Sequence, residues 1–263
     1  MATINHEWRS ASTADGGTAL STTTARVLFP LGTTKAKLHA RNLSTAKAAQ
    51  VAPMPWITVL HTDDNLSTVT DASDSMQDGA DGTLLTLSSM DTLANGDFVL
   101  VGSHVPLRGL QVDVGAVNGT ASVMTVKYWN GSAWADISDT DGTADSGATL
   151  AQDAAITWTV PTAHVKERMR GMGLAPGAGV PFTYDPLFWY RIEVSAALDS
   201  SVTVLGMLGL PRYTTYAELA ANENLEQDTK TSLGGHSGVE GKTAAGTANL
   251  IVNVFSSGDG FDG

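Results

Sequence analysis

The sequence of 263 residues contains no cysteine and few aromatic residues, which make up 6% of the chain. Without cysteine, the fold must close without disulfides, and thiolate zinc sites, iron–sulfur clusters and cysteine nucleophiles are excluded. This fits a protein assembled in a reducing cytoplasm. Apolar residues still make up 42% of the chain. We therefore expect a globular protein with one large core or two small ones.

Long apolar runs are also lacking. No stretch approaches the roughly 18 to 20 apolar residues that a bilayer span requires, and residues 1–8 show no basic run followed by an apolar one. We expect neither a secretory signal nor a membrane anchor, and no membrane partner. The 27 acidic residues outnumber the 15 Lys and Arg and give a formal charge of −12. Because this charge repels phosphate backbones, we expect no nucleic-acid partner.

The negative charge is unevenly distributed along the chain. Residues 1–47 hold six Lys or Arg against two acids, so this segment is +4 and the remainder is −16. A basic leading segment on an acidic body suits docking onto an acidic neighbour, including another copy of the chain. Ordinary scatter of surface charge would give the same count.

Runs rich in Val, Ile, Thr and aromatic residues recur between clusters of Gly, Asp, Asn and Ser, and few windows show helical spacing. This pattern is typical of antiparallel β-proteins, and we predict an all-β, jelly-roll-like sandwich. The expected strands cover residues 25–31, 35–41, 56–62, 83–87, 98–101, 110–114, 122–129, 155–160, 188–195 and 202–208.

The run at 122–129 shows both signals of a strand that ends in a turn. Met124 and Val126 fall on one face and Thr125 and Lys127 on the other, as in a half-buried strand. Asn-Gly pairs at 118–119 and 130–131 bracket this run. Since Asn and Gly tolerate the positive φ of tight turns, both pairs predict hairpin turns.

Two segments, 162–170 and 216–227, predict short helices. Residues 1–24 and 229–249 contain few large apolar side chains, so neither segment can offset its ordering entropy with a core of its own. The predicted organisation is an extended N-terminal arm over 1–24, a sandwich core over 25–210 that is densest in strand signals over 84–210, a short helix or connector over 211–228, and a flexible C-terminal arm over 229–263 that ends in a strand.

The strand-like run at 249–255 stands at the far end of that arm and needs a sheet edge to pair with, in its own sheet or in a neighbouring subunit. We expect the two arms to contact neighbouring subunits. The candidate interface residues are Trp8, Arg9, Ile251, Val252, Val254 and Phe255.

No group of residues in the sequence predicts catalysis, and we expect no enzyme activity. The six histidines are widely spread, and none forms a His-x-His or His-x-x-x-His pair. Asp139, Asp141 and Asp145 surround a glycine as in the opening of a calcium loop, although Leu150 stands where such loops carry glutamate. Calcium is therefore the one candidate cofactor, and a solvated acidic turn is the alternative.

Aromatic residues offer a second route to ligand binding. Trp129 and Trp134 flank the predicted turn at 130–131, where exposed rings could stack on sugars, and Tyr184 is a third candidate. With so few aromatic residues in the chain, the core has first claim on most of them.

Five segments together resemble a known family: 99–107, 124–134, 141–150, 156–161 and 188–194. The second contains Tyr-Trp-Asn-Gly-x-x-Trp, the fourth is an apolar strand that ends in proline, and the last contains Trp-Tyr-Arg. This order is similar to β-sandwich structural proteins of tailed bacteriophages, over about half the chain. The resemblance implies a virion component without enzyme activity, assembled in the host cytoplasm.

Within the virion, the expected function is that of a capsid decoration or cement protein that stabilises the head through many subunit contacts. We expect it to bind itself, as a homo-oligomer and preferably a trimer, and to bind the major capsid or other virion proteins. The alternatives are a tail, neck or baseplate component, and a carbohydrate-binding β-sandwich module.

Overall fold

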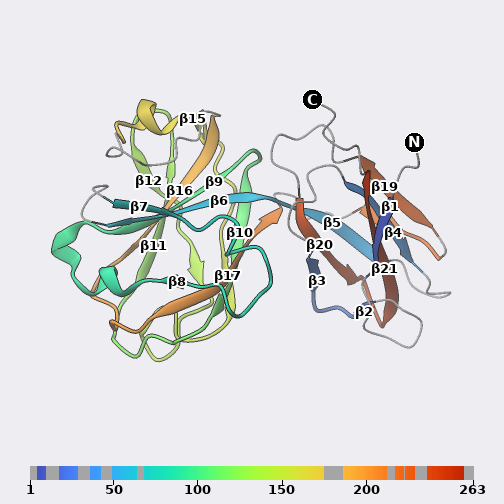
Figure 1. Ribbon diagram of the computed structural model, residues 1–263, viewed down its shortest axis with the longest axis horizontal. Helices are drawn as coiled ribbons and strands as arrows, with labels where there is room; N and C mark the ends of the chain where they lie inside the picture. Colours follow the sequence, from blue (N-terminus) through green and yellow to red (C-terminus); the bar gives the residue numbers. More distant parts are fainter. Residues whose placement is uncertain are drawn as a thin grey trace. The chain divides into compact units, whose positions relative to one another are not determined.

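The computed structural model describes residues 5–9, 18–28, 36–42, 49–63, 68–174, 186–211, 217–221, 223–228 and 236–257. These residues form 21 strands and three short 3-10 helices (Figure 1). The predicted all-β sandwich class is confirmed, because half of the structure is strand and several antiparallel sheets pack together. Within the described residues, no helix reaches seven residues.

The chain divides into two compact units, which differ from the predicted arms and core. Unit 2 is the continuous segment Trp56–Arg212, and unit 1 combines Met1–Pro55 with Tyr213–Gly263. Residues 25–55 belong with the two ends of the chain. We expected residues 25–62 to add about three strands either to the same sandwich as 84–210 or to a small separate sheet. The sequence does not reveal this division, because no linker separates residues 55 and 56.

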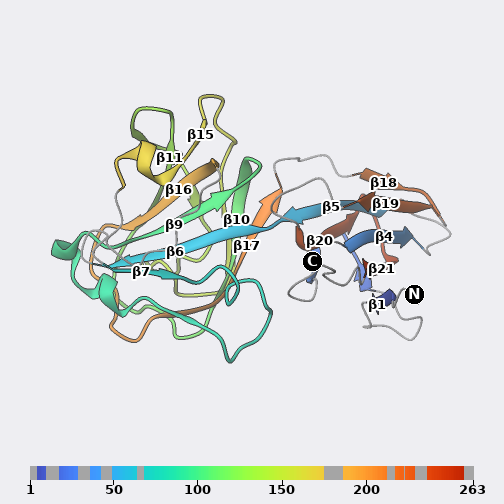
Figure 2. The same ribbon diagram turned by 45° about the horizontal axis from the view of Figure 1, so that its top comes forward.

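Unit 2 contains two antiparallel sheets. The seven-stranded sheet has the order β12 (Trp134–Asp136), β11 (Met124–Trp129), β16 (Leu187–Val194), β9 (Phe98–Ser103), β6 (Ile57–Asp63) and β7 (Thr68–Asp71), and β15 (Lys166–Glu167) also pairs with β16 (Figure 2). The five-stranded sheet has the order β13 (Thr140–Asp141), β14 (Ala154–Thr157), β10 (Leu107–Val114), β17 (Thr203–Pro211) and β8 (Leu85–Thr86).

The main core of unit 2 lies between these sheets. Side chains alternate along each strand, so Val99 and Val101 of β9 join this core while Phe98 and Leu100 point to the other face. Met124 and Val126 of β11 are also buried in it, which confirms their predicted alternation. β6, β9, β11 and β16 thereby each contribute alternate residues to this core.

The second face of the seven-stranded sheet is partly covered as well. Met169, Met172 and Leu174 pack against it, and they belong to the short 3-10 helix η3 (Met169–Met172) and the turn after it. The helix predicted over 162–170 is wrong, because β15 pairs with the start of β16 and only one 3-10 turn follows. Strand pairing and burial of the methionines override the local helical spacing.

The two predicted hairpin turns have different outcomes. Residues 130–131 join β11 to β12 as a hairpin, and Gly131 has a φ of 98°, which favours glycine. The hairpin predicted at 118–119 is wrong, because the chain crosses there from β10 in one sheet to β11 in the other. Asn118 is buried, and its Nδ2 donates to the carbonyls of Thr120 and Thr149, so it stabilises a crossover.

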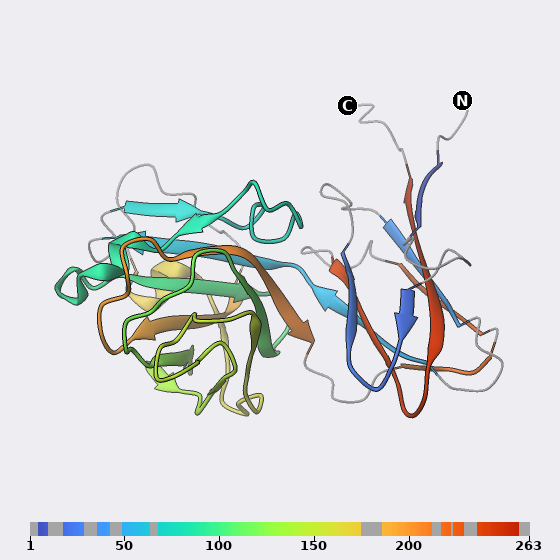
Figure 3. The same cartoon turned by 90° about the horizontal axis from the view of Figure 1, so that it is seen from below.

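Unit 1 also contains two antiparallel sheets. One has the order β1 (Asn5–Arg9), β21 (Ala248–Ser257), β4 (Ala36–Asn42) and β19 (Asn224–Asp228), and β2 (Thr18–Leu20) also pairs with β21. The other has the order β18 (Ala217–Leu219), β5 (Ala49–Pro55), β20 (His236–Thr243) and β3 (Ala25–Leu28). In Figure 3 the long red strand β21 runs beside the dark-blue β1.

The described parts of both predicted arms are thus strands of unit 1. β20 lies between β5 and β3, and β21 pairs with β4 on one side and with β1 and β2 on the other. The helix predicted over 216–227 is also wrong, since β18 pairs with β5 and β19 with β4. These segments have few large apolar side chains, but their backbone groups find partners in sheets built by distant parts of the chain.

Candidate functional site

Three tryptophans lie in a row on the outer face of the seven-stranded sheet, which is the face away from the main core. Trp134 of β12 pairs with Trp129 of β11. Tyr128 of β11 pairs with Tyr190 of β16, which places the next residue, Trp129, beside Trp189. Trp129 and Trp189 belong to the second apolar cluster, and Trp134 packs against it.

One end of this row is closed. The Trp189 side chain is fully buried, and its Nε1 donates to the Glu167 carbonyl at 2.8 Å. Gly102 lies beneath it, where a Cβ would stand 2.7 Å from Leu187 Cδ1 and 2.9 Å from Trp189 Cζ3. Only glycine allows the indole to approach this strand so closely.

The next row on the same face carries charges. Lys127 Nζ lies 2.6 Å from Glu193 Oε2, and Arg191 forms an ion pair with Glu193 Oε1. The Arg191 guanidinium also lies over two rings, 4.9 Å from the Phe98 centroid and 5.4 Å from the Trp134 centroid. These three charged side chains remain about a quarter exposed, at 28, 25 and 24% for Lys127, Glu193 and Arg191. Arg191 is therefore held in place while still reaching the surface.

Trp129, which we predicted to stack on a ligand, is buried. Its side chain is only 6% exposed, and its ring meets the edge of Trp134 at a centroid distance of 5.6 Å. Its Nε1 is buried and has no acceptor among the described residues. Trp134 is half-buried and is the more accessible of the pair, whereas Tyr184 lies outside the described residues.

The three aspartates of the predicted calcium loop do not converge. Asp139 accepts a hydrogen bond from the Val126 amide at 2.9 Å, and Asp141 accepts from Thr143 Oγ1 at 2.6 Å and from Thr149 Oγ1 at 2.5 Å. Asp145 is exposed in the loop beyond. Across the described parts of the chain, no group of three His, Asp or Glu side chains is placed to hold a metal ion. Asp141 instead braces its own loop through Thr143 and Thr149, and Asp139 ties the loop to β11.

The candidate interface residues of the two arms find partners within the chain. Trp8 pairs with Val254, and Arg9 pairs with Asn253, in antiparallel register. On its other side β21 pairs with β4, which gives Ile251, Val252, Val254 and Phe255 the partners Arg41, Ala40, Leu38 and Lys37. The run at 249–255 therefore pairs in its own unit, and its contact with neighbouring subunits stays a prediction.

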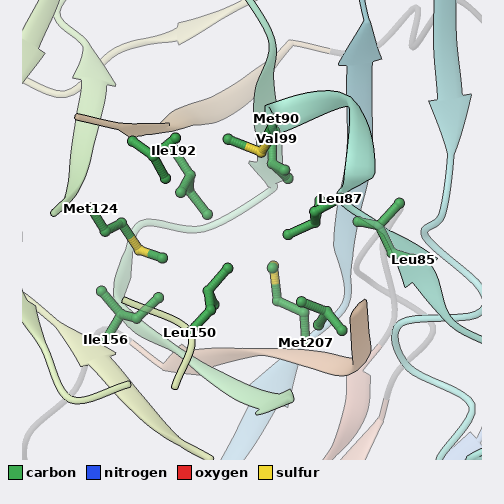
Figure 4. Close-up of a pocket in the computed structure, with 11 residues that line it drawn as sticks. Leu85, Leu87, Met90, Val99, Met124, Leu150, Ile156, Ile192 and Met207 are labelled. Atoms are coloured by element: carbon green, nitrogen blue, oxygen red, sulfur yellow. The ribbon is translucent and has the colours of Figure 1, made fainter. Parts of the chain in front are cut away.

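A small cavity lies in the main core of unit 2 (Figure 4). Its volume is about 20 Å³, and its lining is apolar, including Met90, Met124, Leu150 and Met207. A buried water needs about 10–15 Å³ and two to four polar partners. Because the lining offers no polar partner, the cavity is a dry packing gap with no room for a substrate.

Two histidines of unit 2 that the sequence did not single out are shielded from water: His61 is buried and His164 is half-buried. His164 contacts the rings of Tyr128, Phe188 and Tyr190 at centroid distances of 4.7–5.4 Å, and its Nε2 lies 3.2 Å from the Trp189 carbonyl. Burial lowers the pKa of His164 to about 4. Neither a motif nor a spacing marks this histidine in the sequence, because its partners come from β11 and β16.

His61 of β6 contacts the 3-10 helix η1 (Ser88–Asp91). Its Nε2 lies 2.9 Å from Ser89 Oγ, and its pKa is lowered by burial, against the opposing effect of Asp63. Since Val59 two residues earlier joins the main core, strand alternation could have placed His61 on the inner face. Both histidines are therefore neutral at pH 7.

Comparison with known proteins leaves the chain without relatives: no family model, curated protein or solved structure matches it. Among the described residues there is no helix with the length and apolar character needed to cross a bilayer. The function must therefore be inferred from the residues of the chain and their contacts.

Proposed function

We propose that the chain is a structural protein of a bacteriophage virion, a capsid decoration or cement protein that stabilises the head through many subunit contacts. The proposal includes self-association, preferably as a trimer, and binding to the major capsid or other virion proteins. It includes no enzyme activity and no nucleic-acid or membrane partner.

The observation that carries the proposal is the arrangement of the segments that resemble phage structural proteins. The Tyr-Trp-Asn-Gly-x-x-Trp segment is the β11–β12 hairpin, and the Trp-Tyr-Arg segment is the middle of β16, which pairs directly with β11. Trp158, which follows the apolar strand β14, packs on Tyr190 of β16 at a centroid distance of 5.1 Å. Segments 60 residues apart in sequence therefore form one structural motif.

Hydrogen bonds to one residue of the other sheet fix this motif. Trp158 Nε1 donates to the Leu107 carbonyl at 2.7 Å, and the Leu107 amide donates to Tyr190 Oη at 2.6 Å. All of these groups are buried, so each contact replaces a lost contact with water. Aromatic residues of the segments that carry the resemblance therefore join the two sheets of the sandwich.

Quantitative mass spectrometry of density-purified virions tests the proposal. We expect the chain to copurify with the particles at a copy number comparable to that of the major capsid protein. A few copies per particle would instead favour the tail, neck or baseplate alternative. A chain that is present in the lysate but absent from purified particles would refute the virion function itself.

Carbohydrate binding is the second candidate, because the half-buried Trp134 and the stacked Arg191 lie together on an outer sheet face. A glycan array, with and without a chelator, tests it. Binding that Trp134→Ala abolishes would support this candidate. No signal in either condition would remove it.

A further inference from the structure

The charges of unit 2 are separated into two regions. Residues 68–97 contain six aspartates and no Lys or Arg, and we call this stretch the acidic segment. Five of the six Lys and Arg that the structure describes in unit 2 belong to β11, β15, β16 or the η3 region: Lys127, Lys166, Arg168, Arg170 and Arg191. With Asp136, Glu167 and Glu193 on β12, β15 and β16, these elements have a formal charge of +2, and we call them the cationic face.

The two regions lie on different elements of unit 2, and the acidic segment runs from β7 through β8, an edge strand of the five-stranded sheet. The seven-stranded sheet begins with β12 and β11 and ends with β7, whose residues open the acidic segment. In Figure 1 the yellow η3 lies at the top of unit 2, and the teal 3-10 helices of the acidic segment, η1 and η2 (Leu93–Asn95), lie at its left. Within one unit, most of the acidic segment therefore belongs to other elements than the cationic face.

The acidic segment presents apolar side chains together with its charges. Asp74, Asp81 and Asp91 are exposed, and in the same segment Leu84 and Leu93 are 46 and 47% exposed. Large apolar side chains at such exposure, set among charges of one sign, are suited to a partner that offers both apolar contact and the opposite charge.

The cationic face offers both. Trp134 is half-buried and Arg191 is held between Trp134 and Phe98, while Arg168 and Arg170 are exposed at η3. Tryptophan and arginine dominate the binding energy of protein interfaces, most of all when they are fixed before binding.

We infer that the acidic segment of one copy docks on the cationic face of another copy. Because the two surfaces differ, the contact is head-to-tail, and it either closes into a ring, such as a trimer, or continues as an array. This inference names the surfaces of the self-association in the proposed function and rests on that proposal.

Charge-reversal variants of the full chain test the inference by sedimentation. Arg168→Glu/Arg170→Glu reverses the cationic face, and Asp74→Lys/Asp91→Lys reverses the acidic segment. We expect the wild type to associate at low salt and to dissociate as salt is added, and each variant to associate about tenfold or more weakly. An equimolar mixture of the two variants should regain association, since each then meets its opposite charge.

Asp145→Lys, at an exposed aspartate outside the acidic segment, is the matched control for Asp74→Lys alone. Near-ultraviolet circular dichroism verifies that every variant is folded. A wild type that stays monomeric at all salt concentrations would overturn the inference. So would folded variants that associate as strongly as the wild type, or a mixture of the two variants that does not associate. Purified protein alone decides these outcomes, so they are independent of whether the chain is found in virions.

Discussion

Both units consist of antiparallel sheets, but they differ in how the chain forms them and in their charge. Unit 2 is one continuous segment with seven Lys or Arg and 18 acids. Unit 1 joins the two ends of the chain and holds eight Lys or Arg and nine acids. Their formal charges are therefore −11 and −1. Net charge bears on solubility and association rather than on fold, so this difference concerns the surfaces of the two units and not their architecture.

The described cores differ as well. Unit 2 buries large aromatic side chains, with Trp189 and Tyr190 fully inaccessible. Among the residues described in unit 1, Asn42 and Glu240 are fully buried polar groups. Unit 2 also buries polar side chains completely, among them Thr62, Thr143 and Thr149. The difference between the described cores therefore lies in the buried aromatic rings of unit 2.

Deletion of residues 248–263 should have the largest effect on this comparison. It removes β21, which pairs with β1, β2 and β4, so we expect unit 1 to lose its structure. Unit 2 contains no part of this segment and should remain folded. Hydrogen exchange of the truncated chain measures both outcomes, and protection of residues 36–42 equal to that in the full chain would contradict the pairing.

The tryptophans of the outer face should separate packing from hydrogen bonding in unit 2. Trp189→Ala should lower the free energy of unfolding by about 3–5 kcal/mol, because a fully buried ring is lost. Trp189→Phe also removes the bond to the Glu167 carbonyl, whereas Trp129→Phe removes a donor that has no acceptor among the described residues. Urea titrations should show Trp189→Phe to be the costlier by about 1–2 kcal/mol. Equal costs would argue against this role of the hydrogen bond.

Arg26→Met should destabilise unit 1 by about 3 kcal/mol, because the fully buried Glu240 then loses the cation opposite it. Arg26 Nε lies 3.4 Å from Glu240 Oε2. The double variant Arg26→Met/Glu240→Met removes both charges and should be less destabilised than Arg26→Met alone. Lys127→Met in unit 2 is the matched surface change and should cost at most about 1 kcal/mol.

A pH dependence of unit 2 is also expected. The pKa of His164 is about 4 in the folded chain against the usual 6.5, so between these values the unfolded chain binds a proton that the folded chain does not. The stabilising contribution is complete above pH 6.5 and is lost as the pH falls toward 4. His164→Phe should flatten this part of the pH profile of unit 2 and leave that of unit 1 unchanged. Thermal melts between pH 4 and 7 measure it, and an unaltered profile would exclude His164 as a source.

Local patterns predicted the strands of unit 2 better than those of unit 1. The run expected at 188–195 is observed as Leu187–Val194, and the alternation of Met124 and Val126 holds. In contrast, Ala217–Leu219 and Asn224–Asp228 form strands only because sheet edges from other parts of the chain are available to them. Such pairing is long-range, and no local periodicity records it.

The candidate site was only partly predictable for the same reason. The motif around Trp129 and Trp134 drew attention to the correct sheet face, but the burial of Trp129 depends on Met169, Met172 and Leu174, which lie 40 residues away. The stacking of Arg191 on Phe98 joins β16 to β9 and follows from register. Register is set by the whole sheet and cannot be obtained from either strand alone.

Scanning calorimetry of the full chain beside the isolated segment 56–212 tests the central claim, that two units of different construction share one chain. We expect two transitions in the full chain, one of which coincides with the single transition of the isolated segment. A single transition in the full chain, together with an isolated segment that does not fold, would contradict the claim.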